Sequence, residues 1–331
     1  MHTKALFLQK KLKKAPSMRS ENVKFAKTSQ NSNTYTMQLI ADSGSTKTAW
    51  LLLHTDGQKR TIFTQGLNPY QQTPEEMLHI LQHELIPALQ GAESSIRAVH
   101  FYGAGCTPEK SPLVSDVLRN ALRTSAPVHV ESDMLGAARA LCQQQPGIVA
   151  ILGTGSNSAY YDGHTLHSLI PALGFILGDE GSGAYIGKRL VGDVFKQQLP
   201  ADLRQQFLTE TGETMASIIQ KVYRTPLPNR FLASLSPFCS RHIQHPAIQA
   251  FLTDCFDQFF QRNILPALQQ PELSSFLSGH TPLVHFAGSI AYHYAAPLRQ
   301  AAIRNGILVG NILSAPLEQL AVYHQREREE E

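Results

Sequence analysis

The stretch LIADSGSTKTAWLLLHTDG, Leu39–Gly57, decides the fold. It places an acid, a glycine, small hydroxyl residues and a lysine between two apolar runs, a composition that suits a phosphate-binding turn. A P-loop would need the pattern GxxxxGK[ST] followed by a helix. Here the spacing differs, and the run Ala49–Leu53 with the Asp56-Gly57 turn predicts a strand and a hairpin. The stretch therefore predicts a phosphate-binding hairpin and not a P-loop.

The same arrangement returns in GIVAILGTGSNSAYYDG, Gly147–Gly163: an apolar strand, a Gly/Ser/Thr turn, a second strand and a DG turn. Such internal repetition indicates a repeated architecture. Apolar spacing predicts the order β-β-β-α-β-α-β-α before the repeat, including a helix over Pro74–Leu89. After the repeat it predicts a long helical stretch from Asp179 to about Gln270, and then strand, helix, strand and helix. We therefore predict an α/β fold with two similar halves whose glycine-rich turns meet in a cleft.

Composition excludes several classes of protein. The 331 residues are 42% hydrophobic, which supplies enough apolar material for two cores. The formal charge of +3 is misleading, because eight Lys/Arg and one acid precede Met37 and leave the remainder mildly acidic. A mildly acidic body argues against a nucleic-acid surface. No apolar run is long enough to span a bilayer. We expect neither nucleic acid nor membrane as a partner.

The two ends of the chain differ from the body. Residues 1–36 are basic, rich in Ser, Asn and Gln, and without a sustained period, so we predict a disordered extension. The run ALFL is too short for a signal peptide, and no small-residue cleavage site follows it, while a transit peptide stays open as an alternative. At the other end, Arg326–Glu331 reads as the fraying end of a helix.

The chain contains four cysteines but no CxxC pair and no Cys/His cluster, so disulfide scaffolds and zinc ribbons are disfavoured. We expect buried free thiols in a reducing compartment, and hence a cytoplasmic protein.

The two turns are the main candidate sites. In the first, the backbone amides and hydroxyls of residues 43–46 can point at one anion, and Asp42 beside them suits Mg²⁺, which prefers a carboxylate with waters and substrate phosphates. An ordinary polar turn is the alternative. The second copy, Gly153–Asn157, weakens that alternative, because two opposed turns could hold phosphates from both sides.

Other acids and glycines have two interpretations each. Asp133, at a strand-to-helix junction, could cap the helix or act as the general base for a substrate hydroxyl. Asp179 and Glu180 could stabilise a helix start or bind sugar hydroxyls. FAGSIA, Phe286–Ala291, could be a structural turn or a surface for an adenosine ring.

Together these motifs resemble the BadF/BadG/BcrA/BcrD ATPase family, especially its N-acetylglucosamine kinase branch in the actin/hexokinase/Hsp70 superfamily. The matching segments run from Met37 to about Tyr323 and are DSGSTKT, GLNP, YGAG, ESDMLGAARA, GTGSNS, GFILGDEGSGAYIGKRL and AGSIAY. GTGSN followed by GDEGS is quite specific, and AGS is not.

The resemblance implies two ribonuclease H-like domains with a nucleotide cleft between them. The first is residues 37–145. The second is residues 146–315 with a helical insertion, and a C-terminal helix in residues 316–331 returns to the first. It implies ATP and Mg²⁺ as cofactors and an amino sugar as acceptor, and it allows a homodimer.

The resemblance also assigns a role to each matching residue. Asp133 would be the catalytic base and Asp42 would hold the metal. ATP phosphates would lie at Gly44, Ser45, Thr46, Lys47, Thr154 and Gly155, with Lys47 the least important. Adenosine would lie at Gly288 and Ser289. The sugar would lie at Asn68, Gly103, Asn157, Asp179 and Glu180.

The first functional hypothesis is a kinase that converts N-acetylglucosamine to its 6-phosphate. Gly103–Gly105 replaces a small hydroxyl turn of some relatives, so N-acetylmuramic acid, N-acetylmannosamine and glucosamine stay open as acceptors. The second is an ATPase that activates a 2-hydroxyacyl-CoA dehydratase through a cysteine-held iron–sulfur cluster. Cys106 and Cys142 are present, but no cysteine suitably follows the second turn. The third is a non-catalytic sugar sensor, against which Asp133 and both turns argue.

Overall fold

The computed structural model describes residues 36–44, 46–271, 273 and 283–330. The chain divides into two units, residues 1–34 and residues 35–331, and the account below concerns the second. The disorder predicted for the N-terminal extension and the phosphate-binding role predicted for Ser45 lie outside the described residues.

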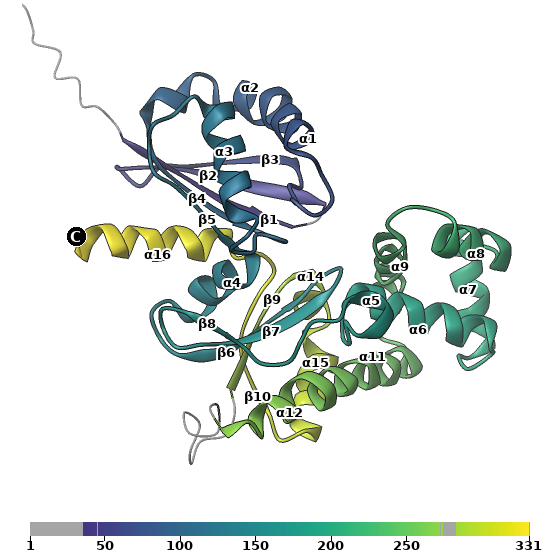
Figure 1. Cartoon of the computed structure of the whole chain (residues 1–331). Helices are drawn as coiled ribbons and strands as arrows, with labels where there is room; N and C mark the ends of the chain where they lie inside the picture. The colour runs from purple at the N-terminus through teal and green to yellow at the C-terminus, as the bar shows by residue number, and fades with distance from the viewer. Residues whose placement is uncertain (1–35, 45, 272, 274–282, 331) are drawn as a thin grey trace, which may run out of the picture. The chain divides into compact units, whose positions relative to one another are not determined.

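The first sheet has the strand order β3-β2-β1-β4-β5 (Figure 1). Strand β2 lies antiparallel between β1 and β3, whereas β4 and β5 run parallel to β1. Its hydrophobic core contains Leu39, Trp50 and Phe101, all fully buried. The strands are β1 (Met37–Ser43), β2 (Lys47–His54), β3 (Lys59–Gln65), β4 (Ile96–Gly103) and β5 (Val128–Ser132).

The helices of the first half follow the predicted order. The helix predicted over Pro74–Leu89 is present and begins with a capping box, in which Thr73 and Glu76 satisfy each other's backbone amides. A π-turn interrupts it. The helical segments are α1 (Pro74–Ile80), η1 (Leu81–Leu85), α2 (Ile86–Leu89), η2 (Ala92–Ser95), α3 (Ser111–Leu122) and α4 (Asp133–Cys142).

The second sheet repeats the topology of the first with the order β10-β9-β6-β7-β8. Strand β7 lies antiparallel between β6 and β8, and β9 and β10 run parallel to β6. The strands are β6 (Gly147–Leu152), β7 (Ser156–Tyr161), β8 (Leu166–Ser168), β9 (Leu283–Ala287) and β10 (Leu308–Leu313). The predicted class, α/β with two similar halves, is confirmed.

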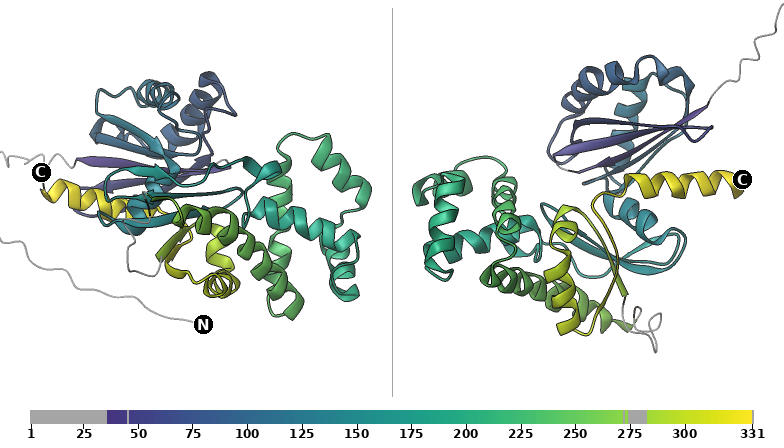
Figure 2. Two further views of the ribbon diagram at one scale, coloured as in Figure 1. Left: turned by 60° about the horizontal axis from the view of Figure 1, so that its bottom comes forward. Right: turned by 180° about the vertical axis from the view of Figure 1, so that it is seen from behind.

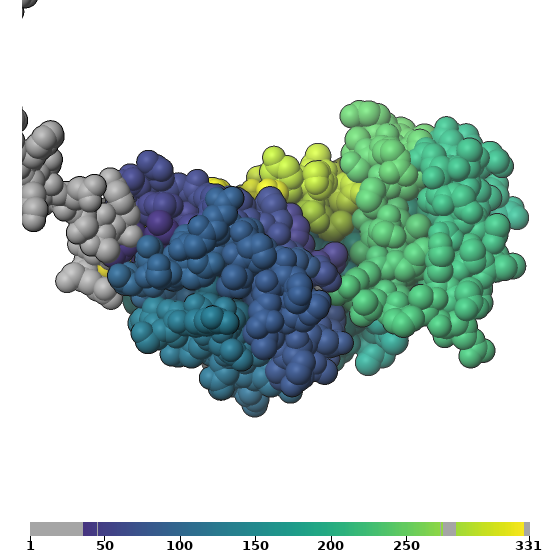
Figure 3. Space-filling model, turned by 90° about the horizontal axis from the view of Figure 1, so that it is seen from above, coloured from purple at the N-terminus to yellow at the C-terminus, as the bar shows by residue number. Residues whose placement is uncertain are grey.

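A long helical segment separates β8 from β9, as predicted (Figures 1 and 2). In Figure 3 these helices, coloured green, form a surface region of their own. Helix α9 crosses α6 closely at Gly187, where a Cβ atom would lie 1.9 Å from the carbonyl oxygen of Leu232. The segments are α5 (Gly174–Leu177), α6 (Gly183–Phe195), α7 (Ala201–Thr211), α8 (Met215–Tyr223), α9 (Pro228–Leu235), α10 (Pro237–Arg241), α11 (Pro246–Phe259), η3 (Phe260–Ile264) and α12 (Leu265–Leu268).

The last helices are α14 (Ser289–His293), α15 (Ala295–Arg304) and α16 (Leu317–Glu330). Helix α16 packs on β1, β2 and α4. There the Tyr102 hydroxyl lies 2.9 Å from His324 Nε2 and accepts a hydrogen bond of 2.8 Å from Arg139. His100 stacks on His324 and on His129, with ring centroids 3.8 and 5.2 Å away. Among the described residues, no helix is both long and apolar enough to cross a membrane.

Candidate active site

The sequence-predicted site residues gather at one edge of each sheet, namely the edge at which the parallel strands end. Asp42 and Gly103 lie at the ends of β1 and β4, and Asp133 follows β5. Gly153 and Gly288 follow β6 and β9 in the second sheet. Ligands of parallel α/β sheets bind outside the carboxyl ends of the strands, so this edge is where a site is expected.

Two carboxylates form the charged centre of the first half. The pKa of Asp42 is raised to about 7, mainly because the carboxyl is buried and also because Asp133 is nearby, whereas Lys47 opposes the shift. Burial likewise raises the pKa of Asp133. Burial therefore disfavours the charged form of both carboxyls, and the charge of Asp133 disfavours the ionisation of Asp42 further, so a nearby cation would favour the ionised Asp42.

Asp133 is not the cap of its helix. Ser132 takes that role, because its Oγ accepts the Leu135 amide at 3.2 Å. Asp133 Oδ1 accepts the amide of the next residue, Met134, at 2.9 Å, and its own backbone amide also contacts the carboxylate. The capping alternative is therefore wrong, and the carboxylate keeps acceptor capacity at the helix N-terminus.

Buried hydroxyl groups at the adjoining ends of β1 and β2 support the first turn. Ser43 Oγ lies 2.7 Å from Thr48 Oγ1 and 3.1 Å from the Leu67 carbonyl, to which it donates, and it accepts the Leu67 amide at 3.0 Å. Gly44 and Thr46 are exposed above them. The Lys47 ammonium lies 4.1 Å from the centroid of the Phe63 ring, on the neighbouring strand β3.

Asn68 is buried against the glycine loop that follows β4. Its Oδ1 accepts the Tyr70 amide at 2.9 Å, and a Cβ atom on Gly105 would lie 2.7 Å from that same oxygen. Gly105 also has a φ of +81°, a conformation that favours glycine. Gly103 is confined for a different reason, because a Cβ atom there would lie 2.5 Å from the Phe101 ring.

The second turn contains no charged residue and is supported by α6. The first two amides of that helix, from Gly183 and Ala184, donate to the carbonyls of Gly153 and Thr154 at 2.8 and 3.0 Å. The turn is also packed against a carboxylate, since a Cβ atom on Gly155 would lie 2.9 Å from Asp179 Oδ2. With its carbonyls engaged by the helix, this turn suits an anion better than a free turn would.

Asp179 and Glu180 lie side by side in the turn before α6, but in different surroundings. Asp179 has a φ of 57° and accepts a hydrogen bond from the Ser156 amide, and burial raises its pKa. Glu180 is buried and is contacted by Arg262 and Asn263. The cap of α6 is Ser182, so neither acid caps the helix. Asn157, the remaining predicted sugar residue, is exposed on β7.

Gly288 is required by the fold. Its φ is +112°, and a Cβ atom would lie 2.4 Å from the Leu152 carbonyl oxygen. Ser289 begins α14 directly after it. The structural interpretation of this turn is therefore sufficient by itself, and the adenosine role of both residues stays a prediction.

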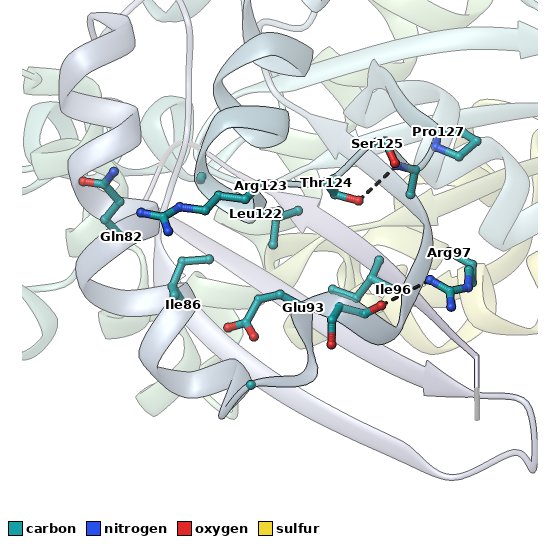
Figure 4. A pocket seen from close by; sticks show the side chains of 14 residues that line it. Gln82, Ile86, Glu93, Ile96, Arg97, Leu122, Arg123, Thr124, Ser125 and Pro127 are labelled. Atoms are coloured by element: carbon teal, nitrogen blue, oxygen red, sulfur yellow. Dashed lines mark hydrogen bonds between the residues drawn. The ribbon is translucent and has the colours of Figure 1, made fainter. Parts of the chain in front are cut away.

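A cavity of about 110 Å³ lies beside the second turn. Asn157, Asp179, Glu180 and Asn263 line it, together with apolar side chains of residues 170–177. A larger hollow of about 1040 Å³ lies elsewhere, among Gln82, Glu93, Arg97 and Arg123 (Figure 4). It opens at the amino ends of β4 and β5 and contains no predicted site residue, so we do not assign it to the site.

The donor set fits a magnesium ion bound together with phosphates. Within the described ranges, no group of three or more His, Cys, Asp or Glu side chains could hold a metal alone. Mg²⁺ usually takes only one or two protein carboxylates and completes its shell with waters and substrate phosphates. Asp42, with its raised pKa beside a second acid, is the natural position for such a charge.

Several supporting residues escaped the sequence analysis. Thr48 and Ser182 are fully buried polar residues that support the first turn and cap α6, and Arg262 and Asn263 reach Glu180 from a distant helix. The Ser43 hydroxyl, which was expected to face the anion, is instead buried against Thr48 and Leu67, so that part of the prediction is wrong. Thr48 and Ser182 sit inside the motifs DSGSTKT and GDEGSG, which could have indicated them. Nothing in the sequence marks Arg262 and Asn263.

The comparisons with known proteins agree with this geometry. No protein-family model matches the chain, and a comparison with curated proteins gave no match. A solved structure named "Putative N-acetylglucosamine Kinase", from Porphyromonas gingivalis, is 44% identical with a TM-score of 0.81, over 88% of this chain and 100% of that one. A protein of the same name from Chromobacterium violaceum is 16% identical with a TM-score of 0.65, over 88% and 99%.

A glucokinase of the ROK family from Streptomyces griseus, solved with glucose and AMPPNP, is 17% identical with a TM-score of 0.50, over 89% and 99% of the two chains. The two distant similarities support the fold alone. The 44% identity over the whole of the Porphyromonas protein shows the family. The chain belongs to the N-acetylglucosamine kinase-like family.

Proposed function

We propose that this protein transfers the γ-phosphoryl group of ATP to a hydroxyl group of an amino sugar, most simply the 6-hydroxyl of N-acetylglucosamine. The observation that carries the proposal is the pair of acids Asp42 and Asp133 at the carboxyl end of the first sheet, where burial raises the pKa of both and Asp133 raises that of Asp42 further. The name of the 44% identical relative supports the choice of sugar.

Asp133 is the proposed general base. Phosphoryl transfer needs positioning, charge neutralisation and one carboxylate to accept the hydroxyl proton. The raised pKa of Asp133 makes it a better proton acceptor than an ordinary aspartate. A Mg²⁺ ion held at Asp42 would supply positive charge to the phosphates when bound.

The remaining roles are proposed by position. Gly44, Ser45, Thr46 and Lys47 of the first turn and Thr154 and Gly155 of the second would contact the phosphates. Gly288 and Ser289 would contact the adenosine. The sugar would be held by Asn68, Gly103, Asn157, Asp179 and Glu180, of which Asn68 and Glu180 are buried and held by hydrogen bonds.

The division into domains at residues 37–145 and 146–315, with a C-terminal segment at residues 316–331, is part of the proposal. So are a homodimer, a cytoplasmic location and membership of the BadF/BadG/BcrA/BcrD ATPase group. All four cysteines are buried free thiols, which disfavours the alternative of a dehydratase activator with a cluster shared between subunits.

An assay of ADP release with a panel of amino sugars tests the proposal. The wild type should respond to N-acetylglucosamine, and Asp133→Asn should lower kcat by about 10²–10⁴-fold while nucleotide binding persists. Asp202→Asn, in the first turn of α7, is the matched control and should retain kcat. A wild type that releases no ADP with any amino sugar, or an Asp133→Asn variant with normal turnover, would overturn the proposal.

A further inference from the structure

The carboxylate of Glu180 is held by two residues that lie far away in the sequence. The Asn263 amide donates from Nδ2 to Glu180 Oε2 at 3.3 Å and to the Phe259 carbonyl at 3.3 Å. Arg262 Nε lies 3.7 Å from Glu180 Oε1, and the Glu180 side chain is only 10% exposed. A buried carboxylate needs such partners, because its desolvation is costly without them. Residues 262 and 263 therefore make the buried position of Glu180 tolerable.

The contact depends on close packing of two segments. Gly181 has a φ of +74°, and a Cβ atom there would lie 2.9 Å from Phe259 Cβ. The turn that carries Glu180 is thus pressed against the end of α11. At this point α11 continues as the π-turn η3, which contains both Arg262 and Asn263. Such turns within helices are frequent at functional sites.

The Glu180 contacts also form the polar wall of the 110 Å³ cavity beside the second turn. Asn157, Asp179, Glu180 and Asn263 line one side, and Leu173 and Leu177 line another. The volume corresponds to a few water molecules, so it suits part of a ligand and not a whole sugar.

A second Arg-Asn pair in the same half holds a carboxylate that lies outside the predicted site. Asn305 Nδ2 donates to Asp257 Oδ1 at 2.9 Å and to the Ala301 carbonyl at 2.8 Å, and Arg304 Nη1 lies 3.1 Å from Asp257 Oδ2. No sequence-predicted site residue takes part. Around Glu180 the matching contacts are longer, so its oxygens keep more acceptor capacity for a ligand hydroxyl.

We propose that Asn263 is a positioning residue for sugar recognition. It fixes the Glu180 carboxylate while Arg262 supplies compensating charge, so that Glu180 accepts hydrogen bonds from sugar hydroxyls at the mouth of the cavity. This inference rests on the proposed kinase function. It adds a residue of the helical segment, 83 positions from Glu180, to the determinants of sugar affinity.

The test compares Asn263→Leu with Asn305→Leu in the full-length protein. Steady-state assays give kcat and the KM values for N-acetylglucosamine and ATP, and thermal unfolding gives Tm. Asn263→Leu should raise the sugar KM about tenfold, the loss expected for a hydrogen bond to a charged group, with little change in the ATP KM. Asn305→Leu should lower Tm and leave the sugar KM unchanged.

Two further variants separate positioning from folding. Asn263→Ser is smaller, cannot reach Glu180, and should raise the sugar KM even if Asn263→Leu fails to fold. In a Glu180→Gln background, adding Asn263→Ser should change the sugar KM less than twofold, because coupled residues are not additive.

Additive effects in the double variant, or a sugar KM within twofold of wild type for Asn263→Ser, would overturn the inference while leaving the kinase assignment intact. A wild type without sugar-dependent ADP release would overturn the kinase assignment and this inference with it.

Discussion

The two hairpin turns occupy matching positions in the two sheets, yet they carry different chemistry. In the first sheet Asp42 pairs with Tyr102 of β4. In the second sheet the corresponding end of β6 places Ile151 opposite Ala287 of β9. The first turn thus has a carboxylate at its base, with Asp133 nearby, and the second has an apolar residue there.

The turns are also held differently. Side-chain hydroxyls of Ser43 and Thr48 support the first turn, whereas the N-terminus of α6 supports the second through Gly153 and Thr154. Acids at both turns would repel a polyphosphate from both sides. In the proposed function, the repeated hairpin would therefore supply two parts of a phosphate site: an acidic turn for a metal ion and a base, and a turn without charged residues of its own for the phosphates.

Removing the acid of the first turn should have the largest effect. Asp42→Asn eliminates the charge expected to hold Mg²⁺, and we expect kcat to fall by about 10²-fold or more, the scale of a lost electrostatic contact in a transition state. The measurement is turnover against Mg²⁺ concentration. The control is Asp56→Asn, in the exposed turn at the other end of the hairpin. Normal turnover with an unchanged Mg²⁺ response would show that the acidic turn does not hold the metal.

Crowding the neutral turn should have an intermediate effect. Gly155→Ala puts a Cβ atom 2.9 Å from Asp179 Oδ2, whereas a Cβ atom on Gly153 has nothing within 4 Å. We expect Gly155→Ala to raise the KM values for sugar and ATP by about tenfold, the cost of about 1.4 kcal/mol of displaced contacts, and Gly153→Ala to stay within twofold. Equal behaviour of the two variants in steady-state assays would show that contact with Asp179 does not matter.

The two similar halves could be predicted from the sequence because the patterns that indicate them are local. Each half begins with an apolar run, a small-residue turn and a DG turn, and the strand order follows from these and from helical spacing. The sequence contains a further repeat that the prediction did not use. Val99-His100-Phe101 on β4 and Val284-His285-Phe286 on β9 lie at matching positions of the two sheets.

What was missed depends on distance along the chain or on irregular backbone. The π-turns η1 and η3 have no distinctive period, so apolar spacing predicts only continuous helix. Asn263 contacts Glu180 across 83 residues, which no local pattern can indicate. The position of Lys47 over Phe63 depends on strand pairing and side-chain direction together.

His100 and His285, at matching positions of the two halves, should differ slightly in how they make the unfolding free energy depend on pH. Burial lowers the pKa of both His100 and His285. For His100 the value is about 3, because the nearby rings of His324 and His129 and the charge of Arg139 add to burial, while Glu327 opposes them. An unfolded histidine titrates near pH 6.5, so below that pH the unfolded chain binds a proton that folded His100 refuses.

This contribution to stability is present above pH 6.5 and is lost as pH falls toward 3, by up to about 1.4 kcal/mol per pH unit for one group. His100→Phe keeps an aromatic ring for stacking and removes the titration. The difference in unfolding free energy between variant and wild type should therefore shift in favour of the variant between pH 7 and pH 5, as measured by urea unfolding. The pKa of Asp42 is raised to about 7, so the contribution of Asp42 to the unfolding free energy decreases as pH rises. This contribution is the same in both proteins and cancels in the difference between them. His285→Phe should show a weaker trend, since His285 lies outside the histidine stack. A pH-independent difference for His100→Phe would show that His100 does not titrate differently in the folded and unfolded states.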